Sequence, residues 1–178
     1  TEIYPRIEGF ALGANDQLTK GAMVLGVNFE KEASYMDIES QIVQGEIPDN
    51  STNGVVVGER FAKYFSFDVG DSLVLIGQGY HGSSATGLFP IVGIVKMPNP
   101  LLDNSIVMMS LAKGQWFYGA DSLVTTYVVG LEDAYKQGRV FKDLQELIPP
   151  QYEVMEWEEM LPELVQMIEA DEGGGIIM

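Results

Sequence analysis

"GVVVGERFAKYFSFDVGDSLVLIG", residues 54–77, decides the fold class of this chain. The apolar run Val55–Val57 predicts a short buried strand, and the residues after it, as far as Phe65, place apolar side chains at helical spacing. Gly70-Asp71 then marks a corner before the strand-like run Ser72–Ile76. A strand, a short helix, a turn and a second strand in so short a stretch predict a small β-rich unit.

The segments around this stretch continue the pattern of short strands. Apolar or alternating runs predict further strands at Ile3–Leu12, Gly21–Val27, Phe89–Val95, Ser105–Leu111 and Leu123–Leu131. The polar segment Asn28–Gly45 predicts one or two short helical turns that end at Gly45. Pro48–Gly54 predicts an exposed loop.

The C-terminal part is expected to hold longer elements. Ala134–Ile148 predicts an amphipathic helix, which Pro149 and Pro150 stop. Tyr152–Trp157 predicts a last strand, and a terminal amphipathic helix follows it. The buried face of that helix is predicted to consist of Trp157, Leu161, Leu164, Val165 and Ile168. Together these elements predict an α+β fold.

Composition and charge exclude several classes of protein. With 46% hydrophobic residues, a chain of 178 residues can fold around a core of its own. Ten basic and 26 acidic residues give a net charge of −16, which opposes binding to nucleic acid or to an anionic membrane surface. The same charge suits the extracytoplasmic side of a membrane. The lack of cysteine excludes thiolate catalysis, disulfides and zinc–thiolate sites.

Neither a membrane span nor a targeting segment is evident in the sequence. No apolar run approaches the roughly 18 residues that indicate a membrane helix. The first residues, "TEIYPRIEGFAL", have neither the basic start nor the apolar core of a signal peptide. If the protein is exported, we therefore expect that this chain is not its natural beginning.

A glycine motif at Gly77, Gly79 and Gly82 matches G-x-G-x-x-G and follows a predicted strand. In a dinucleotide-binding fingerprint the third glycine opens a helix whose N-terminus faces the pyrophosphate. Here "SSATGLFPIVGIV" leads into another strand instead. We therefore interpret the motif as the tip of a β-hairpin.

The single histidine, His81, lies at that predicted tip beside Tyr80. A general base needs a nucleophile and an orienting partner. The nearby Ser83 and Ser84 lie in no G-x-S-x-G elbow. A solvated loop histidine is the simpler interpretation. Because exposed aromatic side chains cover interface area well, Tyr80 and His81 are also candidate partner contacts.

Acidic residues cluster in the sequence at Glu156, Glu158, Glu159 and Glu163, at Asp171 and Glu172, and at Asp68 and Asp71. Paired carboxylates can hydrolyse glycosidic bonds, and carboxylate-rich loops can hold calcium. No D-x-D-x-D-G spacing is present, and glutamates at the start of a helix are explained by the helix macrodipole. We therefore predict no catalytic residue, no metal and no cofactor.

Five segments, in this order, resemble the extracytoplasmic domain of FtsX-like ABC transporter permeases, the MacB-like periplasmic core domain. They are "RIEGFAL", "GAMVLGV", "GVVVGERFAKYFSFDVGDSLVLIG", "FPIVGIVKMPNPLLDNSIVMMSL" and "VMEWEEMLPELVQMIEADEGGGIIM". The most telling pieces are Val55–Gly58, Gly70-Asp71, Val92–Ile94 and Trp157–Pro162. The family includes MacB-type exporters and the permeases that release lipoproteins from the inner membrane.

The resemblance implies a division of the chain. Residues 1–50 and 120–178 would form a mixed α/β porter-like part, and residues 51–119 a β-rich sabre-like part inserted between them. The protein would continue into membrane helices at both ends. Gly173–Met178 would then be the entry to the next membrane helix, and we expect these residues to pack poorly here.

The resemblance also implies a function and a place in the cell. The domain would catalyse nothing, and would transmit the motion of ATP-driven cytoplasmic subunits to export or to lipoprotein release. It would lie on the periplasmic side of the inner membrane. Its partners would be a cytoplasmic ABC ATPase subunit, a second permease subunit and a periplasmic adaptor or carrier protein, with no nucleic acid.

One departure from the family concerns the Gly77–Leu88 hairpin. Lipoprotein-releasing relatives recruit a periplasmic carrier through a long hook at the corresponding place, whereas this hairpin is short and glycine-rich. That argues against recruitment through a hook. Two other classes stay open at this point. One is a secreted binding module or carbohydrate-active enzyme that uses paired carboxylates, and the other is an intracellular nucleotide-binding protein, which requires a helix after Gly82.

Overall fold

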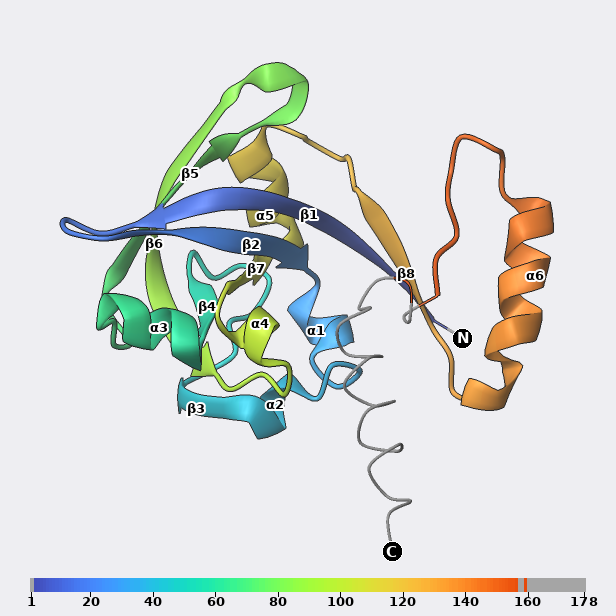
Figure 1. Cartoon of the computed structure of the whole chain (residues 1–178), viewed down its shortest axis with the longest axis horizontal. Coiled ribbons are helices and arrows are strands. Elements are labelled where there is room, and N and C mark those ends of the chain that lie inside the picture. The colour runs from blue at the N-terminus through green and yellow to red at the C-terminus, as the bar shows by residue number, and fades with distance from the viewer. Residues whose placement is uncertain (1, 157–158, 160–178) are drawn as a thin grey trace, which may run out of the picture. The chain divides into compact units, whose positions relative to one another are not determined.

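The computed structural model describes residues 2–156 and 159 (Figure 1). The chain divides into two compact units, Glu2–Gly130 and the part from Leu131 onward. Each unit is described by itself below. The predicted terminal helix after Trp157 and the predicted poor packing of Gly173–Met178 lie outside the described residues.

Six strands of the first unit form a sheet that closes on itself. Their order around the ring is β1 (Glu2–Ala14), β2 (Thr19–Val27), β7 (Ile106–Ser110), β4 (Val55–Gly58), β6 (Ser84–Val95) and β5 (Ser72–Gln78). The ring closes because β1 pairs with β2 along Ile7–Ala14 and with β5 along Ala11–Ala14. The pairs β2–β7 and β4–β6 are parallel, and the other pairs are antiparallel.

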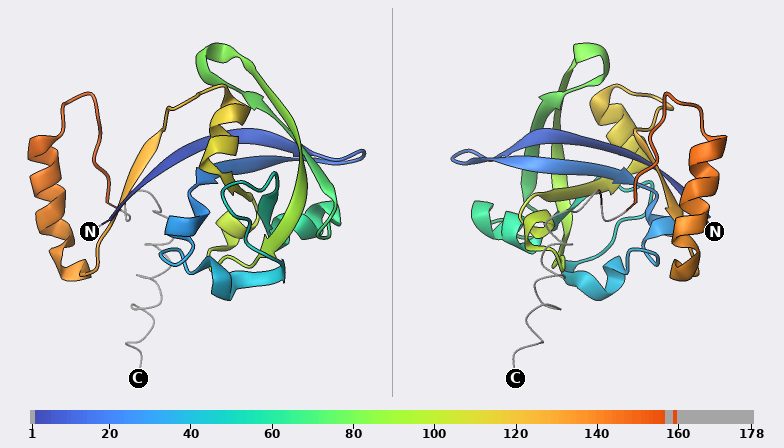
Figure 2. Two further views of the ribbon diagram at one scale, coloured as in Figure 1. Left: turned by 180° about the vertical axis from the view of Figure 1, so that it is seen from behind. Right: turned by 45° about the vertical axis from the view of Figure 1, so that its right-hand side comes forward.

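Two further strands extend this closed sheet. β3 (Ile42–Gly45) pairs with the end of β6. β8 (Thr126–Gly130) pairs with Glu2–Arg6, the first part of β1, and makes a two-stranded ribbon. Figure 2 shows β1 running from this ribbon into the closed sheet without a break. One strand therefore links both parts of the unit.

The interior of the closed sheet holds the main hydrophobic core. Along β5, for example, Leu73 and Leu75 face inward and are fully buried, while Val74 and Ile76 face outward. The two helices that complete the core are α3 (Glu59–Phe65) and α5 (Leu111–Tyr118). Full burial of a leucine side chain such as Leu73 or Leu75 stabilises the fold by about 1.5–3 kcal/mol. The inward-facing residues include Ile7, Val24, Val57, Leu73, Leu75, Phe89, Ile91, Val107 and Met109.

Helix α5 lies unusually close to β2, because two glycines face each other there. A Cβ atom at Gly114 would lie 2.7 Å from Ile7 Cγ2 and 3.2 Å from Gly26 Cα. We expect Gly114→Ala to lower the free energy of unfolding, because overpacking costs about 1–3 kcal/mol. The gain of Ala over Gly inside a helix is smaller, at most about 1 kcal/mol.

Urea denaturation of the chain measures this change, with Gly21→Ala on β2 as the matched control. A Cβ atom at Gly21 would meet no atom within 4 Å. We expect the control to keep or slightly raise stability. Equal stability of the two variants would show that α5 does not pack as closely on β2 as described.

A second hydrophobic cluster covers part of the outside of the closed sheet. Outward-facing Leu25, Val56 and Met108 lie beneath Phe29 and Ile38. The covering segment consists of α1 (Phe29–Glu32), α2 (Ile38–Gln41) and β3. The outside of the sheet at β2, β4 and β7 is thus buried in the same way as its interior.

The second unit begins with a short 3-10 helix, η2 (Ala134–Lys136), followed by α6 (Gln137–Leu147). Phe141 and Leu144 on α6 are half-buried, and no described side chain of the helix is fully buried. Gln137 Nε2 donates a hydrogen bond of 3.4 Å to Glu156 Oε1. This contact joins the start of α6 to the chain that returns after Pro149-Pro150.

Most predicted elements of the first unit are confirmed, and the structure corrects others. The strands predicted from residues 3–12, 21–27, 72–76, 89–95, 105–111 and 123–131 are present, some with shifted ends. The predicted helical turns through Gly45 are wrong over Ile42–Gly45, where β3 pairs with β6. The strand predicted at Tyr152–Trp157 is also wrong, since Tyr152–Glu156 forms no strand in the structure.

Two short helices were not predicted, although the chain carries signals for both. Asn99 caps α4 (Pro100–Asp103), with its side chain accepting a hydrogen bond from the Leu101 amide and Pro100 at the first helical position. Ser110 caps α5 in the same way and ends the apolar run of β7. Both caps closely follow apolar segments, so the sequence pattern does not show where the strand ends and the helix begins.

Candidate partner surface

The Gly77–Leu88 segment is a β-hairpin, as predicted. β5 and β6 pair from Ser72 opposite Pro90 to Gln78 opposite Ser84, and η1 (Tyr80–Gly82) joins them. β6 begins at Ser84, so no helix follows Gly82. The dinucleotide-binding interpretation of the glycines therefore has no support here, because that motif needs the third glycine to open a helix.

Short hydrogen bonds hold the tip of the hairpin. The Gly79 amide donates to Ser83 O at 2.7 Å, and Ser83 Oγ donates to Tyr80 O at 3.0 Å. His81 and Gly82 both have a positive φ, 53° and 77°. This conformation disfavours a side chain at residue 81, so the histidine is held in a strained turn.

Gly79, at the base of the tip, packs closely against Tyr118 at the end of α5. A Cβ atom at Gly79 would lie 2.5 Å from Ser83 Oγ and 2.7 Å from Tyr118 O, so only glycine fits there. Tyr118 itself is buried, and its hydroxyl has no hydrogen-bond partner among the described residues. Burial raises the pKa of Tyr118 to about 12. The hairpin tip therefore packs at Gly79 against Tyr118, a buried residue of the core.

The structure brings Tyr80 and His81 together on the solvent side of this tip. Their ring centroids lie 4.0 Å apart with the rings tilted by 55°, and Tyr80 is 50% exposed. The phenol ring of Tyr80 and the imidazole ring of His81 form a small aromatic surface. Such a surface suits contact with a partner better than catalysis. Their role as partner contacts stays a prediction.

The carboxylate clusters named from the sequence have structural contacts where the structure describes them. Asp71 Oδ2 accepts a hydrogen bond from the Asp68 amide at 2.8 Å and fixes the Gly70 corner. Glu159 Oε2 accepts one from the Glu156 amide at 3.1 Å. Glu158, Glu163, Asp171 and Glu172 lie outside the described residues. Within residues 2–156 and 159, no group of three or more His, Asp or Glu side chains is placed to hold a metal.

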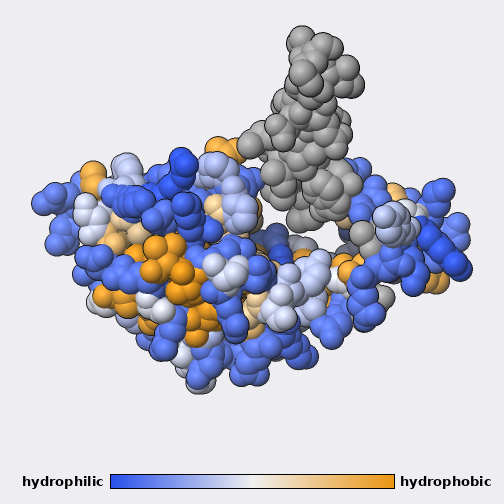
Figure 3. Space-filling model, turned by 90° about the horizontal axis from the view of Figure 1, so that it is seen from below, coloured by the Kyte–Doolittle hydropathy of each residue, from blue (hydrophilic) through white to orange (hydrophobic). Residues whose placement is uncertain are grey.

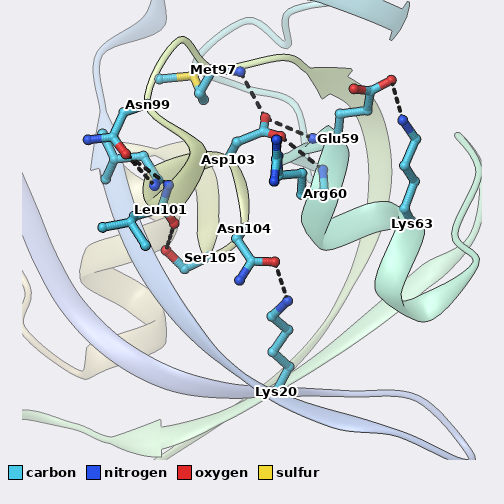
Figure 4. A network of polar contacts seen from close by, with 11 residues as sticks. Lys20, Glu59, Arg60, Lys63, Met97, Asn99, Leu101, Asp103, Asn104 and Ser105 are labelled. Carbon is cyan, nitrogen blue, oxygen red and sulfur yellow. Dashed lines mark hydrogen bonds and ion pairs between the residues drawn. The ribbon is translucent and has the colours of Figure 1, made fainter. Parts of the chain in front are cut away.

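Asp103 is a buried carboxylate with a structural role. It is 2% exposed, and Figure 4 shows its carboxylate facing the first turn of α3. Oδ1 accepts hydrogen bonds from the Glu59 amide at 3.2 Å and the Met97 amide at 2.8 Å. Oδ2 accepts one from the Arg60 amide at 3.1 Å. The side chain therefore caps α3 and fixes the loop at Met97.

Glu32 is the second buried carboxylate, and it pairs with Arg6. Arg6 Nη2 and Nε lie 2.6 Å and 2.7 Å from Glu32 Oε2. The pair joins β1 to α1 at the point where β1 passes from the ribbon into the closed sheet. Tyr4 packs on Tyr35 close by, with centroids 5.2 Å apart. Both carboxylates are thus held in the fold and have no access to a substrate.

The described part of the chain contains no helix that is long and apolar enough to cross a membrane. Neither a family model nor a curated protein sequence matches the chain.

Solved structures, however, match it over most of its length. The extracellular domain of the noncanonic ABC-type transporter YknZ from Gram-positive bacteria aligns with 88% of this chain and 81% of its own, at 13% identity and a TM-score of 0.56. The periplasmic region of MacB from Actinobacillus actinomycetemcomitans aligns with 83% of this chain and 67% of its own, at 13% identity and a TM-score of 0.53.

The chain has the fold of these extracytoplasmic ABC transporter domains. The predicted α+β class is confirmed, and so is the resemblance drawn from the five segments, at the level of the fold. The division into porter-like and sabre-like parts stays a prediction.

Proposed function

We propose that this chain is the extracytoplasmic domain of an ABC transporter permease subunit. The observation that carries the proposal is the likeness to the YknZ and MacB domains over 88% and 83% of the chain. The domain is non-catalytic. It transmits motion driven by cytoplasmic ATP hydrolysis to an exported substrate or to a lipoprotein that is released from the membrane.

The proposed partners and location follow from this function. A cytoplasmic ABC ATPase acts on the domain through the rest of the permease, beside a second permease subunit and a periplasmic adaptor or carrier. The domain lies on the periplasmic side of the inner membrane. Residues 1–50 and 120–178 form the porter-like part, and residues 51–119 the sabre-like part. The net charge of −16 supports the absence of nucleic acid among the partners.

The path of β1 supports mechanical transmission. Its first residues pair with β8 in the ribbon, and its last residues pair with β5, which leads directly to the hairpin tip. The Arg6–Glu32 pair fixes the strand between these two regions. A displacement of the ribbon would therefore pass along β1 to β5, with which β1 is hydrogen-bonded, and along β5 to Tyr80 and His81 at the tip.

A labelling experiment tests the proposed location. Tyr80→Cys, in the protein produced in its own cells and freed of other cysteines, is expected to react with a membrane-impermeant maleimide while the cytoplasmic membrane is intact. Leu73→Cys, at a fully buried position, is the control and is expected to react only after denaturation. If the thiol of the Tyr80→Cys variant were labelled only after the cytoplasmic membrane is opened, the proposal would be contradicted.

The hairpin tip gives a second expected result. Tyr80→Ala/His81→Ala is expected to keep the free energy of unfolding within about 1 kcal/mol, because both side chains are exposed. The variant is expected to fail to restore the phenotype of a deletion strain, while the purified transporter keeps its ATPase rate. Leu101→Ala, also at an exposed position, is the control and is expected to restore the phenotype. Full restoration by the tip variant would show that the tip contacts no required partner.

A further inference from the structure

One region on the outside of the closed sheet is apolar and is not covered by the described residues of the first unit. Its side chains come from three adjacent strands, and most are strongly exposed: Phe10 80%, Leu88 64%, Ile76 46% and Leu12 42%, with Val74 half-buried. Leu12 lies opposite Ile76 across β1 and β5, and Val74 lies opposite Leu88 across β5 and β6. Residues directly opposite each other share one face of a sheet. We call these five residues the bare face.

The bare face continues a surface that the chain covers elsewhere. Phe10 lies opposite Met23, and the next pair on the same side is Glu8 opposite Leu25. Leu25 belongs to the outer cluster that Phe29 and Ile38 bury. The covering segment thus reaches Leu25 on β2 and leaves Phe10 on β1 exposed. Contiguous apolar surface of this kind commonly marks a site of interaction.

Acidic residues border the bare face, and the basic Lys20 on the neighbouring strand β2 donates a hydrogen bond to Asn104. β5 and β6 carry no charged residue at all, and Arg6, the one basic residue of β1, is paired with the buried Glu32. Three acidic residues border the face: Glu8 near Phe10, Asp71 before β5, and Glu46 beside Pro90 in an open hollow. Figure 3 shows the molecule from below, where hydrophobic residues also lie among hydrophilic ones at the surface.

We propose that the bare face binds a partner protein through an apolar contact surface that lysine and arginine side chains surround. The apolar side chains would supply the buried centre of the contact, and the acidic border would select a basic rim on the partner. This inference goes beyond the proposed function, since it names a surface and the chemistry of its partner and holds whether or not the chain serves a transporter.

Charge complementarity disfavours the other occupants. A second copy of this chain carries the same net charge of −16. The chain's own residues 131–178 contain twelve acidic and three basic residues. An anionic lipid surface would likewise be repelled. Each of these occupants would give a distinct result in the test below.

Site-specific photo-cross-linking in cells that produce the complete protein tests the proposal. A photoreactive phenylalanine analogue is placed at Phe10 or Leu88, and at Leu101 as the matched control, because Leu101 is 61% exposed but lies on α4. We expect Phe10 and Leu88 to cross-link to the same protein, at a peptide whose apolar residues are flanked by Lys or Arg. Leu101 is expected to give no such product.

Two substitutions sharpen the result. With the probe at Phe10, Leu88→Glu is expected to reduce the cross-link at least tenfold, and Asp68→Lys, at the exposed corner beside the acidic border, about threefold. Both positions are exposed, so both variants are expected to fold. Cross-links to a second copy, to residues 131–178 or to lipid would overturn the proposal. Equal products at Leu101, no product at all, or a gain from Asp68→Lys would also overturn it.

Discussion

Asp103→Ala is expected to lower the free energy of unfolding by about 3–5 kcal/mol. The buried carboxylate accepts hydrogen bonds from the amides of Glu59, Arg60 and Met97. Alanine would leave three amides without this acceptor, and each buried unsatisfied group costs about 1–3 kcal/mol. Water that enters the space would recover part of this loss, so the total lies below the simple sum.

Urea denaturation followed by circular dichroism measures the effect of Asp103→Ala. Asp121→Ala, at an exposed position, is the matched control and is expected to change stability by no more than about 0.5 kcal/mol. Asp103→Asn keeps one carbonyl oxygen but points an NH2 group at backbone donors, so an intermediate loss is expected. A loss below about 1 kcal/mol for Asp103→Ala would contradict the role assigned to this carboxylate.

Arg6→Met is expected to cost a similar amount, about 3–5 kcal/mol, for a different reason. Glu32 is fully buried, and Oε2 lies 2.6 Å from Arg6 Nη2. Glu32 Oε1 has no hydrogen-bond partner among the described residues. Removal of the guanidinium would leave a buried carboxylate without its counter-charge, which is more costly than the loss of the attraction alone.

The double variant Arg6→Met/Glu32→Met separates these two costs. Since both charged groups are removed, the desolvation cost of the carboxylate disappears, and most of the stability is expected to return. Denaturation of the two single variants and the double variant completes the cycle. If the double variant were as unstable as the sum of the single variants, the pair would not be coupled as the structure shows.

Local elements of this fold are predictable because their signals are local. Val55–Val57, the turn at Gly70 and the apolar run at Phe89–Val95 carry their own periodicity and breakers, and all three are confirmed. The closure of the sheet was not predicted, since it depends on Ala11 pairing with Gly77 far along the chain. Strand register of that kind is set by packing in the interior and leaves no trace in a short stretch of sequence.

The surfaces proposed to contact partners show the same contrast. The hairpin and its Tyr80-His81 tip could be predicted, because the residues after Gly82 have the pattern of a strand and not of a helix. The bare face was not predicted, because Phe10 and Ile76 have the alternating pattern of ordinary strand residues. Only the pairing of β1 with β5 shows that they lie together and uncovered. Likewise, Arg6 and Glu32 form an ion pair that their separation in sequence does not indicate.

Purification of the complete protein from the membranes of its own cells, in mild detergent, tests the central claim most directly. The proteins that co-purify are identified, and ATP hydrolysis by the complex is measured. The account predicts a stoichiometric ABC ATPase and ATP hydrolysis that is lost when the ATPase subunit is inactivated. Recovery of the protein without any ATPase, or from the soluble fraction alone, would contradict it.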